Sequence, residues 1–233
     1  MEIIGQSVDN RNIYGVEIGK GDRVIYLDAS MHAAEVASTV FLTMFLNDLV
    51  YKYESGDKDI INALNNVKLV LIPSLNPDGY EVYNFGIESI RNKDLWIYQN
   101  KDIVNFRTFK YNANGVDLNR NFDWNWDNNP VTTPFTDNYK GTSPFSENES
   151  KYIKYVFDKY NIDSMIDVHN YPERWDNNPY KYVFYGDTKT WDIIEDLMVY
   201  LKRNDNSLPI NHLTSQNDSC VNNYASSVKQ IPS

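Results

Sequence analysis

The sequence has little cysteine and no excess of basic residues. Its single cysteine, Cys220, excludes an internal disulfide framework and a thiolate-rich zinc site. The formal net charge is −10, with 22 Lys and Arg against 32 Asp and Glu. No basic cluster interrupts this acidic balance. We therefore expect neither nucleic acid nor an anionic membrane to be the main partner.

Long apolar runs are also missing. The longest apolar stretch, residues 36–50, is interrupted by Ser38, Thr43 and Asp48, so it does not have the composition of a membrane span. The opening Met1-Glu2-Ile3-Ile4-Gly5 has neither the basic nor the apolar region of a signal peptide. We expect a soluble protein, cytoplasmic because no signal peptide is visible, or secreted if the sequence has been trimmed to its mature part.

What the sequence does contain is enough apolar material for one large core. Hydrophobic residues make up 42% and aromatic residues 14% of the 233 residues, which suits one α/β domain over 1–233. A hairpin is predicted within 1–23. Alternation of predicted strands and helices indicates a mixed sheet with helices on both faces. The strands are at 12–18, 24–29, 67–72, 162–168 and 180–185; the helices are at 34–53, 58–65, 146–160, 188–203 and 219–228.

Three local features refine this assignment. Asn76-Pro77-Asp78-Gly79 is interpreted as a turn, because proline presets φ at the second position and glycine tolerates positive φ. Ser146 and Glu149 have the spacing of a capping box. Val40 belongs to the predicted inner face of helix 34–53. The stretch 80–139 is irregular, and so long a loop inside a compact domain is usually functional.

The chain has three histidines, and two of them follow predicted strands. Glu35 lies three residues after His32, in the predicted first turn of a helix, so these side chains can converge. With His169 they form the ligand set of a catalytic zinc, which leaves one position for water. The alternative is structural: the helix dipole favours a glutamate in a first turn, and a histidine at a strand end is often a polar rim residue. His212 is predicted to lie on the surface.

Several motifs occur in the order of one known family. They are Gly5-x-Ser7 with Arg11, His32-x-x-Glu35, Asn76-Pro77-Asp78-Gly79-Tyr80, Gly115-Val116-Asp117-x-Asn119-Arg120-Asn121, Gly141 with Phe145-Ser146-Glu147, and His169-Asn170-Tyr171. Over residues 3–233 the chain resembles the zinc metallocarboxypeptidases, the carboxypeptidase A/B-like group. The resemblance implies one zinc ion, held by His32, Glu35 and His169, that polarises a carbonyl and activates water for hydrolysis of the C-terminal peptide bond.

The same resemblance assigns substrate-binding residues. Asn119 and Arg120 offer planar, charge-assisted donors to a terminal carboxylate, and Tyr171 matches a substrate-binding tyrosine. A structural ion pair is the alternative for Arg120, and simple packing is the alternative for Tyr171. Arg91 and Arg107 are rival candidates for polarising the scissile carbonyl.

One expected catalytic residue is missing from the sequence. Family members carry the general-base glutamate in a strand that would follow Ser233. We therefore expect a chain truncated at its C-terminus, without the last strand and helix, that binds zinc with little turnover because the general base is absent. Glu173 is the only local stand-in.

The resemblance implies a peptide substrate, and the class of peptide is left open at this point. The stretch 76–115 is similar to bacterial members that cut γ-D-glutamyl–diamino acid bonds of cell-wall muropeptides, whereas the Asn119–Arg120 pair favours a free α-carboxylate. A zinc-dependent deacylase of N-acyl amino acids and a non-catalytic zinc- or peptide-binding module are the other hypotheses. The sequence does not predict an oligomeric state.

Overall fold

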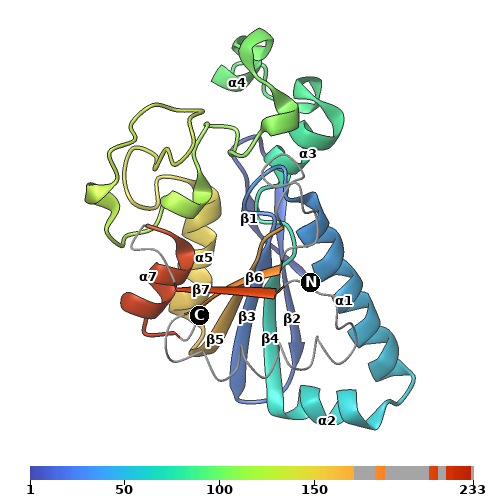
Figure 1. Ribbon diagram of the computed structural model, residues 1–233. Coiled ribbons are helices and arrows are strands. Elements are labelled where there is room, and N and C mark those ends of the chain that lie inside the picture. Colours follow the sequence, from blue (N-terminus) through green and yellow to red (C-terminus); the bar gives the residue numbers. More distant parts are fainter. Residues whose placement is uncertain (171–181, 187–209, 215–218, 232–233) are drawn as a thin grey trace.

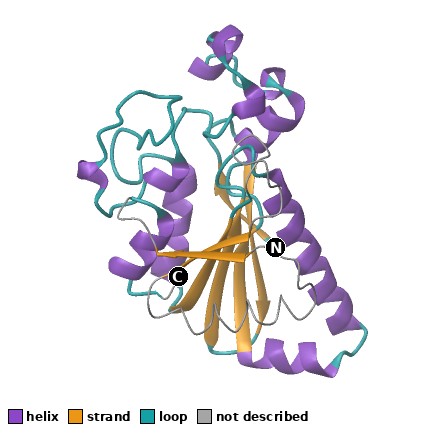
Figure 2. Cartoon of the chain, viewed as in Figure 1, coloured by secondary structure: helices purple, strands orange, loops and turns teal. Residues whose placement is uncertain are grey.

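The computed structural model describes residues 1–170, 182–186, 210–214 and 219–231. A five-stranded mixed sheet in the order β1-β2-β4-β3-β5 forms its centre (Figures 1 and 2). Its strands are β1 (Glu2–Gln6), β2 (Asn12–Gly19), β3 (Arg23–Ala29), β4 (Val67–Ile72) and β5 (Ile162–Val168). β2 is antiparallel to β1 and β4, while β3 is parallel to both β4 and β5. The mixed sheet and the N-terminal hairpin are confirmed.

The helices flank this sheet. They are α1 (Val36–Glu54), α2 (Lys58–Asn66), α3 (Pro77–Phe85), α4 (Trp96–Gln99), α5 (Asn148–Lys159) and α7 (Val221–Ser227). Short 3-10 turns cover Ile87–Ser89, Lys101–Ile103, Phe106–Thr108, Leu118–Arg120 and Trp126–Asn128. The predicted irregular stretch is thus built mainly of loops and single turns. No helix in the described part of the chain combines the length and apolar character needed to cross a bilayer.

Two further strands, β6 (Tyr182–Gly186) and β7 (Ile210–Thr214), pair in parallel as a separate sheet. β6 confirms the predicted strand, of which residues 180 and 181 lie outside the described part of the chain. β7 was not predicted. It contains His212, and the predicted surface position of that side chain stays a prediction. The predicted helix 188–203 lies outside the described residues.

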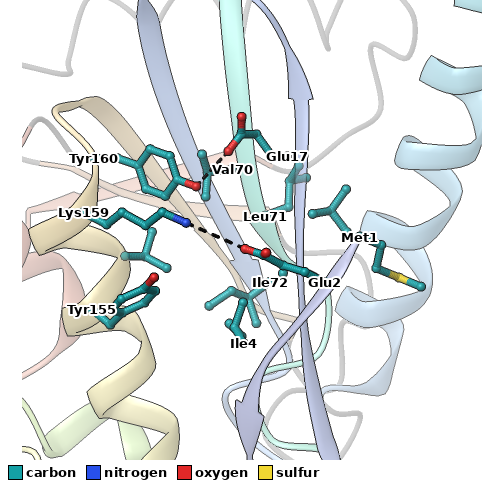
Figure 3. A pocket seen from close by; sticks show the side chains of 13 residues that line it. Met1, Glu2, Ile4, Glu17, Val70, Leu71, Ile72, Tyr155, Lys159 and Tyr160 are labelled. Carbon is teal, nitrogen blue, oxygen red and sulfur yellow. Dashed lines mark hydrogen bonds and ion pairs between the residues drawn. The ribbon is translucent and has the colours of Figure 1, made fainter.

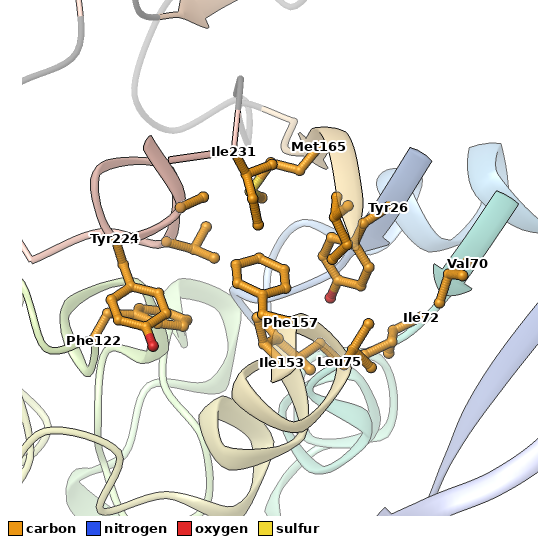
Figure 4. Packing of buried hydrophobic residues seen from close by; sticks show 14 of the residues in the cluster. Tyr26, Val70, Ile72, Leu75, Phe122, Ile153, Phe157, Met165, Tyr224 and Ile231 are labelled. Atoms are coloured by element: carbon orange, nitrogen blue, oxygen red, sulfur yellow. The ribbon is translucent and has the colours of Figure 1, made fainter. Parts of the chain in front are cut away.

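The alternation of side chains along β3 divides the core into two layers. Val24 and Tyr26 face α5 and α7, where the Tyr26 ring meets Phe157 edge-on with centroids 5.2 Å apart (Figure 4). Leu27 and Ala29 face the opposite side and pack with residues of α1 and α2. Helices therefore cover both faces of the sheet, as predicted.

The prediction for Val40 was wrong. This side chain is 48% exposed, whereas Leu42 and Leu49 form the buried face of α1. Apolar side chains such as Phe41 occur on the outer side of the helix as well. Periodicity alone therefore did not identify the face that packs on the sheet.

The predicted turn at Asn76 is the start of helix α3. The Asn76 side chain caps this helix by accepting a hydrogen bond from the Gly79 N–H at 2.9 Å, and Pro77 occupies the first turn. Asparagine at the N-cap followed by proline is a helix-start signal as well as a turn signal. Gly79 does not have a positive φ; a side chain there would meet the Ala33 Cβ at 2.6 Å. Glycine is needed for close approach to the His32 loop.

Asn76 also binds the His32 loop through its side-chain amide, and a substitution can test this contribution to stability. Its buried Nδ2 donates to the carbonyls of Met31 at 3.2 Å and Tyr111 at 3.0 Å. Asn76→Ala is expected to lower the free energy of unfolding by about 2 to 5 kcal/mol, because a cap is lost and buried carbonyls lose a donor. Urea unfolding measures this, with exposed Asn84→Ala of the same helix as control. Equal values for both variants would contradict the assignment.

The prediction of a capping box at Ser146 was also wrong. Helix α5 begins at Asn148, its N-cap is Glu147, and no side chain caps it. The Ser146 hydroxyl donates to the Glu147 carboxylate at 2.7 Å instead. Glu149 is fully buried and lies 3.3 Å from the Asn112 amide nitrogen. Because the Glu149 side chain is directed into the interior toward Asn112, it does not cap the N-terminus of α5.

Candidate metal centre

The two predicted histidine ligands lie at one edge of the sheet. β3 and β5 are parallel neighbours with Ala29 opposite Val168, so the loops that follow them begin side by side. This register brings the His32 and His169 rings to 4.9 Å between centroids. Glu35 is the N-cap residue of α1, which begins at Val36. The glutamate therefore immediately precedes the first turn in which it was predicted, because the helix begins two residues later than expected.

The Glu35 carboxylate lies between the two rings. Its Oε1 is 2.8 Å from His32 Nδ1, and its Oε2 is 2.6 Å from His169 Nδ1. One ligand atom from each of the three residues lies within 4.8 Å of the other two. His32 and Glu35 are buried, whereas the His169 side chain is 29% exposed. The cluster is therefore mostly buried, and solvent has access to it on the side of His169.

Each imidazole has a second carboxylate at its far nitrogen. His32 Nε2 lies 3.1 Å from Asp117, and His169 Nε2 lies 2.7 Å from Asp167. An ionised carboxylate only accepts hydrogen bonds, so in a neutral imidazole a hydrogen on Nε2 would leave the lone pair of Nδ1 directed toward Glu35. Acceptors then face acceptors, and a proton or a cation must lie between them. The donor set fits zinc, whose histidine ligands have such outer carboxylates.

The electrostatics of the cluster keep its acidic groups ionised. Burial acts to raise the pKa of the Glu35 carboxyl, but the charges and hydrogen bonds of His169 and His32 outweigh it and lower that pKa. Burial likewise opposes ionisation of Asp117, yet Lys110 and His32 hold its pKa well below the usual range. The carboxylates of Glu35 and Asp117 are thus stabilised by neighbouring positive charge, from the imidazoles and from Lys110.

Lys110 is a residue at the site that the sequence analysis missed. Its buried Nζ donates to the second oxygen of Asp117 at 2.8 Å, and its carbonyl accepts from the Ala33 N–H at 3.1 Å. The positive charge of Lys110 therefore balances the negative charge of Asp117, the carboxylate that contacts His32 Nε2. The local sequence does not distinguish Lys110 from a surface lysine, because its partners Asp117 and Ala33 lie in other loops.

Asn119 and Arg120 lie in the 3-10 turn Leu118–Arg120 beside the cluster. Asn119 Nδ2 is 3.3 Å from His169 Nε2, and its Oδ1 accepts from the Val221 N–H at 3.0 Å at the start of α7. The Arg120 guanidinium donates to the Asn119 carbonyl at 2.7 Å, while Ser219 donates to the Arg120 carbonyl at 2.9 Å. The structure therefore brings Asn119 to the histidines, with Arg120 next to it.

The other predicted site residues are not joined to the cluster by a described contact. The exposed Arg91 donates from its backbone N–H to Asp9 at 2.8 Å and from its guanidinium to the Asn10 carbonyl at 3.3 Å. The backbone of Arg107 lies in the turn Phe106–Thr108, and its side chain is outside the described part. Tyr171 and Glu173 also lie outside the described residues.

A cavity of about 310 Å³ lies elsewhere, between α5 and strands β1, β2 and β4 (Figure 3). Lys159 and Glu2 form an ion pair across it at 3.8 Å, and Tyr160 donates to Glu17 at 2.8 Å. None of the three candidate metal ligands lines this cavity.

Comparison with known proteins gives the class to which this fold and site belong. The sequence profile of the zinc carboxypeptidases matches residues 1–230. The chain belongs to the zinc carboxypeptidase family. It is 30% identical over 154 residues to mouse mast cell carboxypeptidase A, covering 64% of this chain and 34% of the relative. It is 35% identical over 160 residues to gamma-D-glutamyl-L-diamino acid endopeptidase 1 of Lysinibacillus sphaericus, covering 63% and 39%. The chain thus spans little more than a third of these relatives.

Solved structures show the same fold. Thrombin-activatable fibrinolysis inhibitor superposes with a TM-score of 0.76 at 19% identity, over 97% of this chain and 57% of that one. Carboxypeptidase A of Helicoverpa armigera gives a TM-score of 0.66 at 20% identity, over 97% and 56%. The mixed α/β sheet predicted from the sequence is confirmed by these structures.

Proposed function

We propose that the chain provides the zinc site and the substrate clamp of a peptidase that removes the C-terminal residue of a peptide. One observation carries the proposal: the Nδ1 atoms of two imidazoles converge on the Glu35 carboxylate, and a further carboxylate lies at the far nitrogen of each ring. His32, Glu35 and His169 would hold the ion. Bound zinc supplies Lewis-acid polarisation of a carbonyl and a more acidic water.

The clamp follows from the position of Asn119 next to His169. Arg120 and Asn119 together offer planar donors that suit a terminal carboxylate, and a carboxylate bound there would bring the last peptide bond to the exposed side of the metal cluster. Tyr171 is proposed as a further substrate contact. Arg91 and Arg107 stay candidates for polarising the carbonyl, and Glu173 stays the local candidate for proton transfer.

Pairs of peptides that differ only in a free or amidated C-terminus test this function. The zinc-loaded chain is expected to bind the free acids and to spare the amides in a fluorescence anisotropy titration. Mass spectrometry of the same mixtures identifies any released C-terminal residue. Equal binding of acids and amides would contradict the proposal, because nothing would then recognise the carboxylate.

Arg120→Ala tests the clamp itself. Binding of free-acid peptides is expected to weaken about 10- to 100-fold, since a hydrogen bond to a charged group contributes about 1.5 to 3 kcal/mol. Binding of the amides should not change. Arg23→Ala is the matched control, because exposed Arg23 begins β3 at the end away from His32. An equal loss for acids and amides would show that Arg120 acts only in the fold.

A cell-wall substrate is the second candidate. Its support is the 35% identity to a bacterial protein named for gamma-D-glutamyl-L-diamino acid bonds. Muropeptides that carry such a bond, added to the peptide pool, separate the two candidates. Cleavage of that bond with the ordinary peptides left intact would favour the cell-wall function.

A further inference from the structure

Two buried acidic side chains lie in the strands next to His169. Asp28 of β3 and Asp167 of β5 are opposite each other in the parallel register, so their side chains leave the same face of the sheet. Asp28 is fully buried, and the Asp167 side chain is 2% exposed. Neighbouring carboxylates in such a place repel each other unless a proton or a cation relieves them.

Among the described residues, each carboxyl group of this pair has one oxygen with a hydrogen-bond partner and one oxygen without. One oxygen of Asp167 lies 2.7 Å from His169 Nε2, and one oxygen of Asp28 accepts from the Tyr26 hydroxyl at 3.1 Å. The remaining oxygen of each, Oδ1, is buried and has no hydrogen-bond partner in the described part of the chain. A single proton on Asp28, donated to Asp167, satisfies both oxygens.

Electrostatics indicate which carboxyl carries that proton. Burial and the charge of Asp167 raise the pKa of Asp28 well above its ordinary range. Asp28 is therefore the partner that keeps a proton, and this proton can be donated to Asp167, whose other oxygen lies against His169 Nε2. A series of hydrogen bonds then joins Tyr26, Asp28, Asp167 and the imidazole.

We propose that Asp167 is the positioning residue of His169, and that Asp28 holds Asp167 in place by donating a hydrogen bond to its second oxygen. Asp167 fixes the ring so that Nδ1 faces Glu35. His32 is held equivalently by Asp117, whose second oxygen is satisfied by Lys110. The inference rests on the proposed zinc site, since positioning has a purpose only if the ring binds a metal.

Zinc affinity tests this role without reference to peptidase activity. Asp167→Asn is compared with Asp163→Asn, because Asp163 lies on the same strand and accepts from the Val24 N–H at 2.7 Å, away from the histidines. Competition with a chromophoric chelator should show Asp167→Asn weaker by about 10- to 100-fold, the usual effect of losing an outer partner of a metal-bound histidine. Asp163→Asn should keep the original affinity. In the cobalt-loaded protein, only Asp167→Asn should shift the visible absorption bands.

A pair of Asp28 variants tests the second part. Asp28→Asn retains a donor for Asp167 and should bind zinc as the unchanged chain does, whereas Asp28→Leu removes the donor and should weaken binding. Thermal unfolding in a chelator shows that each variant folds.

The outcomes separate this inference from the proposed function. If the unchanged chain binds no zinc, both fail. If it binds zinc and Asp167→Asn matches Asp163→Asn in affinity and spectrum, Asp167 does not position His169. Equal weakening by both Asp28 variants would overturn the donor role of Asp28.

Discussion

His169→Ala is expected to bind zinc more than about 100-fold less tightly than the unchanged chain. Loss of an outer partner alone lowers metal affinity about 10- to 100-fold, and loss of a ligand removes a bond to the ion itself. The variant also leaves Asp167 without its partner at 2.7 Å. Competition with a chelator of known affinity measures the change.

His212→Ala is the matched control for this experiment. His212 is the third histidine, it lies in β7, and no role at the metal is assigned to it. Its replacement should leave zinc stoichiometry and affinity unchanged. One tightly held zinc ion in His169→Ala would contradict the ligand set.

Glu149→Gln is expected to make the protein more stable at alkaline pH. Burial, with the negative charge of Asp78, raises the pKa of Glu149 to about 8 in the folded protein, against 4.5 as its ordinary value. Its Oε1 is buried without a hydrogen-bond partner in the described part of the chain. Ionisation in the folded state is therefore unfavourable, and a neutral glutamine avoids it.

The sign of the pH dependence follows from proton linkage. Between pH 4.5 and about 8 the folded chain binds more protons at Glu149 than the unfolded chain does. Stability due to this group is therefore complete below pH 4.5 and is lost as pH rises to about 8. At about 1.4 kcal/mol per pKa unit, the loss amounts to several kcal/mol.

Urea unfolding at pH 5, 7 and 9 measures this difference. The gap between Glu149→Gln and the unchanged chain should be small at the acidic end and should grow with pH. Glu54→Gln, at an exposed position of α1, should follow the unchanged chain at all three values. A gap that stays constant would mean that Glu149 is already ionised in the folded protein.

Much of the site follows from local patterns in the sequence. Apolar strands that end before His32 and His169 predict two ligands at one sheet edge, because parallel strands end together. The three predicted ligands do come together. The family motifs also pointed to Asn119, which lies against His169.

The parts that were missed depend on contacts between distant residues. Asp117 and His32 are 85 positions apart, so no local pattern shows that they pair. The partnership of Asp28 with Asp167 depends on the strand register. At Asn76 the same residues suit a turn and a helix start, and contacts with distant residues, such as the packing of Gly79 on Ala33, are not visible in the local sequence.

Zinc K-edge X-ray absorption of the loaded chain tests the proposed metal centre most directly. The account predicts nitrogen and oxygen neighbours at about 2.0 to 2.2 Å, with the outer-shell scattering of two imidazole rings. That imidazole signal should halve in His169→Ala when the variant is loaded at high zinc concentration. A sulfur neighbour at about 2.3 Å, or a spectrum without imidazole scattering, would contradict a centre built from His32, Glu35 and His169.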